Sequence, residues 1–285
     1  MVIRCVVAGV DGSRASLKAL DWAADEAVRR GVPLRLVHAC PWERYERDVD
    51  DEGDPISIRA ETRVLVAGAL DRATRRRPEA VVSTEVLPEG AETALLGLAH
   101  DAPLLVVGSR GHGGFPGLLL GSVSLRVAAR ATYPVVVVPD VPLPDRPRGR
   151  VVLGVGDEAG AAVGFAVEEA GLRRAELHLV RGRHPDSHAA GAADAVPAGG
   201  SGGSAGAAGG LLIGAAGRDL PPGVTVHRHE ATRRAAHALL EAGAEADLVV
   251  VGSVHRSGRT GLHLGPVSHA LLHHAPCPVA VVPAD

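Results

Sequence analysis

The sequence has few aromatic residues, few cysteines and a single lysine, and each shortage excludes something. Aromatic residues make up 2% of the 285 positions, so any core must be built from Val, Leu and Ala. The three cysteines, Cys5, Cys40 and Cys277, lie far apart and form no Cys-x-x-Cys pair, which favours reduced thiols over a disulfide framework. Because Lys18 is the only lysine, the chain has no Gly-x-x-x-x-Gly-Lys-Ser/Thr phosphate loop.

Strong net charge and long apolar runs are also missing. A net charge of −3 gives no general electrostatic attraction for nucleic acid. The arginine run Arg75–Arg77 is interpreted as the solvated end of a helix, where cations oppose the helix dipole. No apolar run reaches the roughly 18 residues that a membrane helix needs, and the N-terminus shows no signal-peptide pattern. We therefore expect a cytoplasmic protein with neither a nucleic-acid nor a membrane partner.

Strand-like and helix-like segments alternate through the first half. This alternation predicts an α/β fold, a doubly wound parallel sheet with helices on both faces. An acidic, polar segment at 43–55 is expected to be an exposed loop. The expected strands are 3–10, 34–39, 81–87, 104–107 and 135–138, and the expected helices are 13–30, 56–77, 91–100 and 123–131.

The same pattern then starts again. Val151–Val155 repeats the first strand, 248–253 repeats the fourth strand, and 278–283 repeats the Pro-flanked valine run at 134–139. We expect two tandem domains, at 1–140 and 150–285, joined by a proline-rich linker at 141–149. The second domain contains a low-complexity segment at about 185–217, and its Ala, Gly and Ser composition predicts disorder from at least 189 to 209.

A glycine-dense stretch, Gly108–Gly117 followed by Gly121-Ser122, connects the fourth strand to the next helix. Backbone N–H groups in such a loop and at a helix start can bind an anion, with Ser122 as a hydroxyl N-cap. Glycine content alone is equally compatible with a simple strand-to-helix connection. The stretch is therefore a candidate phosphate-binding loop.

The spacing Gly108-x2-Gly111-x9-Gly121-Ser122 resembles the nucleotide loop of the universal stress protein family, in its ATP-binding branch. Val6–Ser13 and Pro134–Pro139 extend the resemblance. It implies strand order 3-2-1-4-5, which would place Asp11 and the Gly108 loop on opposite walls of one crevice. It also implies ATP-binding roles in the turn, the adenine pocket, the base and ribose border, and the phosphate loop. Gly9 and Asp11 belong to the turn, and Val37, His38 and Ala39 to the adenine pocket. Val107 and Gly108 border the base and ribose, and Gly111, Gly121, Ser122 and Val123 form the phosphate loop, with weaker roles for Arg110 and His112.

The second copy departs from this pattern. Gly156 stands where the first copy has Asp11, His255 replaces Gly111 and Pro266 replaces Ser122, although Gly265 matches Gly121. Proline removes an N–H donor, so we expect this half to bind ATP poorly and to serve mainly as a structural partner. Members of the family pair through their last strands, which predicts such a pair within this chain and leaves a homodimer possible.

Histidines are frequent in the C-terminal half. His269 and His273 are four residues apart and could share a helix face, as metal ligands sometimes do. No Cys or Glu nearby in the sequence completes the set, so a solvated or pH-responsive surface is the favoured interpretation and no metal site is predicted. The histidines concerned are His227, His229, His237, His255, His263, His269, His273 and His274.

The resemblance implies an ATP-binding stress-response protein that acts as a nucleotide-dependent sensor or adaptor, with Mg²⁺ as a companion ion and an unknown protein partner. No general base, nucleophile or metal-carboxylate cluster stands out beside the loop, so no catalytic residue is assigned. Two alternatives remain open. One is a slow ATPase or adenylate-handling enzyme, and the other is a dimerisation scaffold that binds no nucleotide.

Overall fold

The computed structural model describes residues 4–41, 55–98, 103–112, 119–144, 146–156, 160–183, 220–253 and 264–284. The predicted disorder at 189–209 and the middle of the glycine stretch, 113–118, lie outside these residues, as does nearly all of the predicted acidic loop. Within the described residues, no helix is long and apolar enough to cross a membrane.

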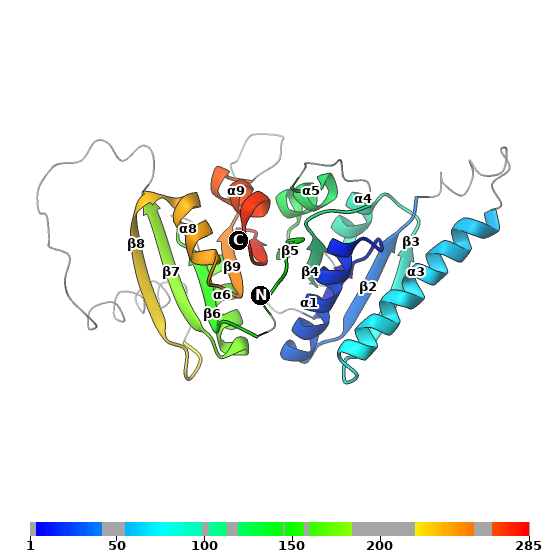
Figure 1. The fold of residues 1–285 in the computed structure, drawn as a ribbon, viewed down its shortest axis with the longest axis horizontal. Helices are drawn as coiled ribbons and strands as arrows, with labels where there is room; N and C mark the ends of the chain where they lie inside the picture. Colours follow the sequence, from blue (N-terminus) through cyan, green and yellow to red (C-terminus); the bar gives the residue numbers. More distant parts are fainter. Residues whose placement is uncertain are drawn as a thin grey trace, which may run out of the picture.

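The first half alternates strands and helices as expected (Figure 1). Its elements are β1 (Cys5–Gly9), α1 (Arg14–Arg30), β2 (Leu34–Ala39), α3 (Pro55–Arg76), β3 (Val82–Leu87), α4 (Ala91–Leu96), β4 (Pro103–Gly108), α5 (Ser122–Arg130) and β5 (Val135–Val138). Helix α4 is shorter than the predicted 91–100, and its end coincides with Gly97, a residue of low helix propensity.

The second half repeats this order. Its elements are β6 (Arg150–Gly154), α6 (Gly160–Arg173), β7 (Glu176–Arg183), β8 (Val226–Arg234), α8 (Ala235–Gly243), β9 (Leu248–Gly252), α9 (Pro266–His274) and β10 (Val279–Val282). Strand β8 was not predicted because its sequence, Val-His-Arg-His-Glu-Ala-Thr-Arg-Arg, is almost entirely polar.

The ten strands found in the described residues form one sheet, in the order β3-β2-β1-β4-β5-β10-β9-β6-β7-β8. Each half therefore has the predicted order 3-2-1-4-5, and its strand pairs are parallel. The two halves meet where β5 and β10 pair antiparallel, with Val137 opposite Val279. The predicted pairing of last strands within one chain is confirmed (Figure 1).

The central strands are continuous apolar runs because helices cover both faces of the sheet. Every residue of β5 and β10 is buried. One core lies between the sheet and α1, α3 and α6, and a second core lies between the sheet and α4, α5, α8 and α9. Alternate residues of one strand pack in different cores. In β4, Val106 belongs to the first core and Val107 to the second.

Helix α1 begins and ends where the sequence predicts. Ser13 is its N-cap, and the Ser13 hydroxyl accepts a hydrogen bond from the N–H of Ser16 at 3.2 Å. Gly31 ends the helix in the left-handed conformation, with φ of 64°.

Helix α1 also packs very closely on β4. A single carbon added to Gly108 would lie 2.5 Å from the backbone carbon of Ala15 and 2.7 Å from the nitrogen of Ser16. Gly108 is therefore required for the packing of helix on strand, and its φ is not positive.

The arginines at the end of α3 are paired with acidic residues. Arg76 and Arg77 both contact the carboxylate of Asp25 on α1, at 2.6 and 2.7 Å, and Arg72 contacts Asp21 at 2.7 Å. These pairs join α3 to α1 and neutralise much of the positive charge of the run.

A cluster of buried charges joins the two halves on the face of the sheet that α1 and α6 cover. Glu26 and Arg30 of α1 face Glu169 and Arg173 of α6, and both carboxylates are fully buried. Arg173 contacts Glu26 at 2.9 Å and Glu169 at 2.5 Å, while Arg30 contacts both of the same carboxylates.

Aromatic rings complete this cluster in a symmetric way. The Arg30 guanidinium lies 5.5 Å from the ring centre of Phe165, on the other half, and the Arg173 guanidinium lies 5.3 Å from that of Trp22. Trp22 and Phe165 occupy the same position in α1 and α6, so each half supplies a ring to the arginine of the other.

The two buried carboxyl groups titrate as a pair. Burial opposes ionisation of Glu26, but Arg173, Arg30 and Arg29 outweigh it and lower the pKa of Glu26 to about 2. Complete burial, together with the nearby charge of Glu26, raises the pKa of Glu169 to about 7 against the attraction of the arginines.

We expect Gly108→Ala to lower the free energy of unfolding by about 1–3 kcal/mol, because the added carbon meets backbone that cannot rotate away. Urea unfolding followed by circular dichroism measures this change. Gly97→Ala is the matched control, because nothing lies within 4 Å of the added carbon there. Equal effects of the two substitutions would contradict the role given to Gly108.

We expect Glu26→Gln to cost about 3–5 kcal/mol of stability, because it leaves buried arginines without their ionised partner. Glu169→Gln should cost much less, because Gln resembles the protonated side chain. The contribution of Glu169 to stability should also fall as pH rises from about 4.5 to about 7, since folding raises the pKa of Glu169 and the folded state holds this proton more tightly. Urea titrations across this range measure it as the free energy of unfolding of the native protein minus that of Glu169→Gln, a difference that should decrease as pH rises.

Candidate functional site

The carboxyl ends of β1, β2 and β4 lie side by side. Gly9 is opposite Val37 of β2, and Ala8 is opposite Val106 of β4. A carbon added to Gly9 would lie 3.3 Å from Cγ1 of Val107. In a parallel sheet with this strand order, the point between β1 and β4 is where connections leave in opposite directions and ligands bind.

Asp11, two residues after β1, links its own turn to the glycine loop. Its Oδ1 accepts a hydrogen bond from the N–H of Ser13 at 2.9 Å, and its Oδ2 accepts one from the N–H of His112 at 3.1 Å. Burial opposes ionisation of Asp11, but hydrogen bonds from Ser13, Ser16 and His112 outweigh it and lower the pKa of its carboxyl group. Asp11 is thus hydrogen-bonded directly to the loop, whereas the resemblance implies that the two lie on opposite walls of a crevice.

Gly111 allows this contact. A carbon added to Gly111 would lie 2.5 Å from Oδ2 of Asp11, although the φ of Gly111 is not positive. The hydroxyl of Ser13 also donates to the carbonyl of Arg110 at 3.3 Å. The turn after β1 therefore holds the first residues of the loop at two points.

At the end of β2, backbone groups are hydrogen-bonded or paired within the sheet. The carbonyl of Val37 accepts a hydrogen bond from the N–H of Val10 at 2.9 Å. His38 is half-buried and its Nδ1–H donates to the carbonyl of Val10 at 2.8 Å. Ala39, also half-buried, pairs with Leu87 of β3. The Val37 carbonyl is therefore already paired in this structure.

Helix α5 begins without a side-chain cap. The N-cap is Gly121, so the prediction of Ser122 as a hydroxyl cap is wrong; Ser122 is the first helical residue. The N–H of Gly121 donates to the carbonyl of Ser109 at 2.7 Å, which closes the described ends of the loop. The N–H groups of Ser122 and Val123, in the first turn, are those that a helix leaves for an external acceptor.

Three cations near the loop share one carboxylate. Asp140, two residues after β5, contacts Arg14 at 2.8 Å, Lys18 at 3.0 Å and Arg110 at 3.1 Å. A hydrogen bond from Arg14, with further help from Lys18, lowers the pKa of Asp140. Arg110 is therefore engaged at the end of the sheet, while the side chain of His112 is exposed.

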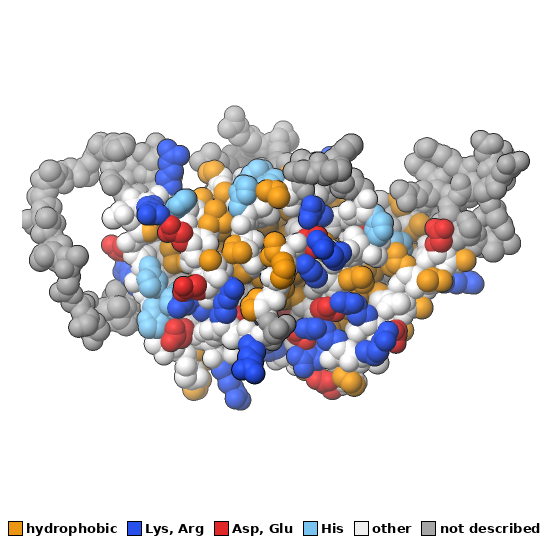
Figure 2. All heavy atoms as spheres, viewed as in Figure 1, with side chains coloured by type: hydrophobic (Ala, Val, Ile, Leu, Met, Phe, Trp, Pro, Cys, Tyr) orange, Lys and Arg blue, Asp and Glu red, His pale blue; other side chains and the backbone are white. Residues whose placement is uncertain are grey.

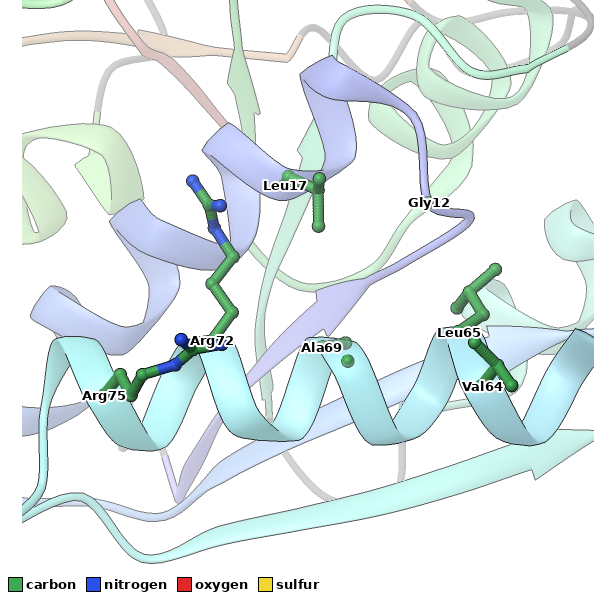
Figure 3. A pocket seen from close by; sticks show the side chains of 8 residues that line it. Gly12, Leu17, Val64, Leu65, Ala69, Arg72 and Arg75 are labelled. Atoms are coloured by element: carbon green, nitrogen blue, oxygen red, sulfur yellow. The ribbon is translucent and has the colours of Figure 1, made fainter.

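An open hollow lies beside Asp11. Asp11, His112 and residues of α3, among them Glu61 and Leu65, line it. It continues past Gly12 between α1 and α3, where Leu17 and Ala69 face it and Arg72 and Arg75 lie at its far end (Figure 3). The open space is therefore next to the turn after β1, on the α3 side, and sequence reasoning did not place α3 or Ser16 near the site.

The second half has the same framework with fewer polar groups. Gly265 is the N-cap of α9 and Pro266 is its first residue, as Gly121 and Ser122 are in α5. Gly156 supplies no carboxylate at the position of Asp11. His255, which replaces Gly111, lies outside the described residues.

Comparisons with known proteins agree with this duplicated architecture. The model of the "Universal stress protein family" matches residues 3–139 and again 147–283. Universal stress protein Rv2005c of Mycobacterium tuberculosis is 35% identical over 297 residues, covering 97% of this chain and 96% of that protein. Universal stress protein Rv1996 of the same organism is 32% identical over 311 residues, with 98% and 96% covered.

Among solved structures, a universal stress protein from Archaeoglobus fulgidus DSM 4304 superposes with a TM-score of 0.68. It is 18% identical, and 98% of each chain is covered, so this likeness concerns the fold of both halves. Two family matches in one chain and nearly full-length relatives lead to one conclusion: the chain belongs to the universal stress protein family and carries the family domain in tandem.

Proposed function

We propose that the first half binds ATP, and that the bound nucleotide controls which protein partner the chain engages. The observation that carries the proposal is the contact between Asp11 and the N–H of His112, which holds the glycine loop against the turn after β1. Beside this contact, α5 begins without a side-chain cap. A helix start of this kind favours phosphate through its free N–H groups and its dipole.

In this proposal the phosphates lie at the N–H groups of Ser122 and Val123. The ribose lies near Asp11, and the base lies toward Val107 and the end of β2, where His38 and Ala39 are half-buried. The residues present also suit Mg²⁺ held mainly by phosphate and water, since both oxygens of Asp11 already accept hydrogen bonds from the chain.

The state of Asp11 favours binding over hydrolysis. A general base works best when its pKa is near the operating pH, whereas hydrogen bonds lower the pKa of Asp11. The carboxylate is thus a weak base that serves to position the loop. This supports a sensor or adaptor role over a slow ATPase or adenylate-handling enzyme.

We expect Ser122→Pro to weaken ATP binding about tenfold or more, because it removes one N–H from the proposed phosphate site. The helix should tolerate it, since proline suits the first helical position and Gly121 already has the extended ψ of 153° that a following proline requires. Calorimetric titration with ATP and Mg²⁺ measures the affinity, and circular dichroism checks the fold.

The chain supplies a matched control for this experiment. Pro266→Ser makes the reverse change at the same position of α9, and ATP affinity should stay unchanged because Gly156 still lacks the carboxylate. One ATP per chain, lost in Ser122→Pro only, supports the proposal. No binding to the native protein would sink it and leave the dimerisation scaffold as the better explanation. Steady phosphate release by the native protein would instead favour the slow enzyme.

A further inference from the structure

Strands β7 and β8 bring histidines and a glutamate together far from the candidate nucleotide site. Figure 2 shows histidines gathered at the end of the molecule that these strands form. His178 of β7 is directly opposite His227 of β8, and Glu176 lies two residues before His178 on the same face. This group sits at the amino ends of the strands, whereas the loops related to the nucleotide site follow their carboxyl ends.

The three side chains converge on one point. One ligand atom from each of Glu176, His178 and His227 lies within 4.8 Å of the other two. Oε2 of Glu176 is 3.1 Å from Nε2 of His178 and 3.7 Å from Nε2 of His227. Ligand atoms around a tetrahedral zinc ion, with bonds of about 2.0–2.1 Å, are about 3.3 Å apart, so two of these separations are close to those of a metal site.

One nitrogen in the group lacks a partner. The side chain of His227 is 41% exposed, yet its Nε2 is buried and makes no hydrogen bond among the described residues. Because this nitrogen faces Glu176 and His178, an ion between the three side chains would satisfy it.

A fourth residue, His229, orients the ring of His178. Nδ1 of His178 lies 2.9 Å from Nε2 of His229, and the two rings are nearly parallel, with an interplanar angle of 8°. Histidines that bind metal commonly donate the N–H of their second ring nitrogen to a hydrogen-bond acceptor, and Nε2 of His229 can accept it here. His229 thus fixes the ring of His178 with Nε2 directed at Glu176.

The nearby positive charge is already paired. Arg150 of β6 is opposite Glu176 in the sheet, and its guanidinium contacts Glu245 at 2.6 Å. The side chain of Glu176 is 52% exposed, so an ion and its water ligands can reach it from solvent.

We propose that Glu176, His178 and His227 bind a divalent transition metal, Zn²⁺, with water as the fourth ligand and His229 as a positioning residue. Two imidazoles and one carboxylate form a donor set that suits zinc. The ion joins β8, the edge strand, to β7. Sequence reasoning missed this site because 49 positions separate His178 from His227 and the intervening chain gives no sign that the two strands pair.

Calorimetric titration with ZnCl2 tests the site on the full chain, prepared without a histidine tag, stripped with chelator and free of nucleotide. We expect one zinc per chain. Glu176→Gln and His227→Ala should each weaken binding at least tenfold, and His229→Ala should weaken it about 10- to 100-fold. Zinc should also raise the melting temperature of the native protein but not that of Glu176→Gln.

His269→Ala is the matched control, because His269 and His273 form another close histidine pair, with ring centres 4.4 Å apart on α9. Its zinc affinity should equal that of the native protein. The proposal is overturned if the native protein binds no zinc, if the double variant Glu176→Gln/His227→Ala binds it unchanged, or if His269→Ala abolishes binding. Circular dichroism of each variant confirms that any loss is not unfolding.

Discussion

The antiparallel contact between β5 and β10 is the constraint on which the rest of the structure depends. It is made entirely of buried aliphatic side chains, and it turns two five-stranded sheets into one sheet whose edges are β3 and β8. In a strand with one polar face, a shift of one residue would expose apolar side chains, but β5 and β10 are apolar on both faces, so this pattern does not fix their alignment. The buried cluster of Glu26, Arg30, Glu169 and Arg173 supplies the missing specificity, since a shift between the halves would leave buried charges unpaired.

The same architecture positions the candidate site. Strand β4 lies between β1 and β5, so the loop that leaves β4 is held from both sides. On the β1 side, Asp11 accepts a hydrogen bond from the loop. On the β5 side, Ser109 accepts hydrogen bonds from the N–H groups of Gly121 and Asp140. Every one of these links depends on the strand ends keeping their register. A rigid sheet with polar turns at its carboxyl edge thus brings together groups that lie about a hundred residues apart in the sequence.

The arrangement of strands could be predicted because continuous apolar runs between turn residues are visible in the sequence. The contacts that matter most could not. Glu26 and Arg30 look like an ordinary exposed pair four residues apart, and only the fold places them against α6. The resemblance assigns Gly108 to the border of the base and ribose, and only the fold shows that the close packing of helix α1 also requires a glycine there. Strand β8 lies at an edge and is polar, so it carries no apolar pattern.

The covalent link between the halves has a consequence for symmetry. Two identical chains must place the same residue on both sides of their axis, whereas this chain sets Trp22 on one side and Phe165 on the other, and gives Glu26 and Glu169 opposite pKa shifts. The same freedom lets Pro266 stand where Ser122 stands in the first half. Since both halves belong to one molecule, dilution cannot separate them, and each half is free to diverge in sequence while the shared sheet persists.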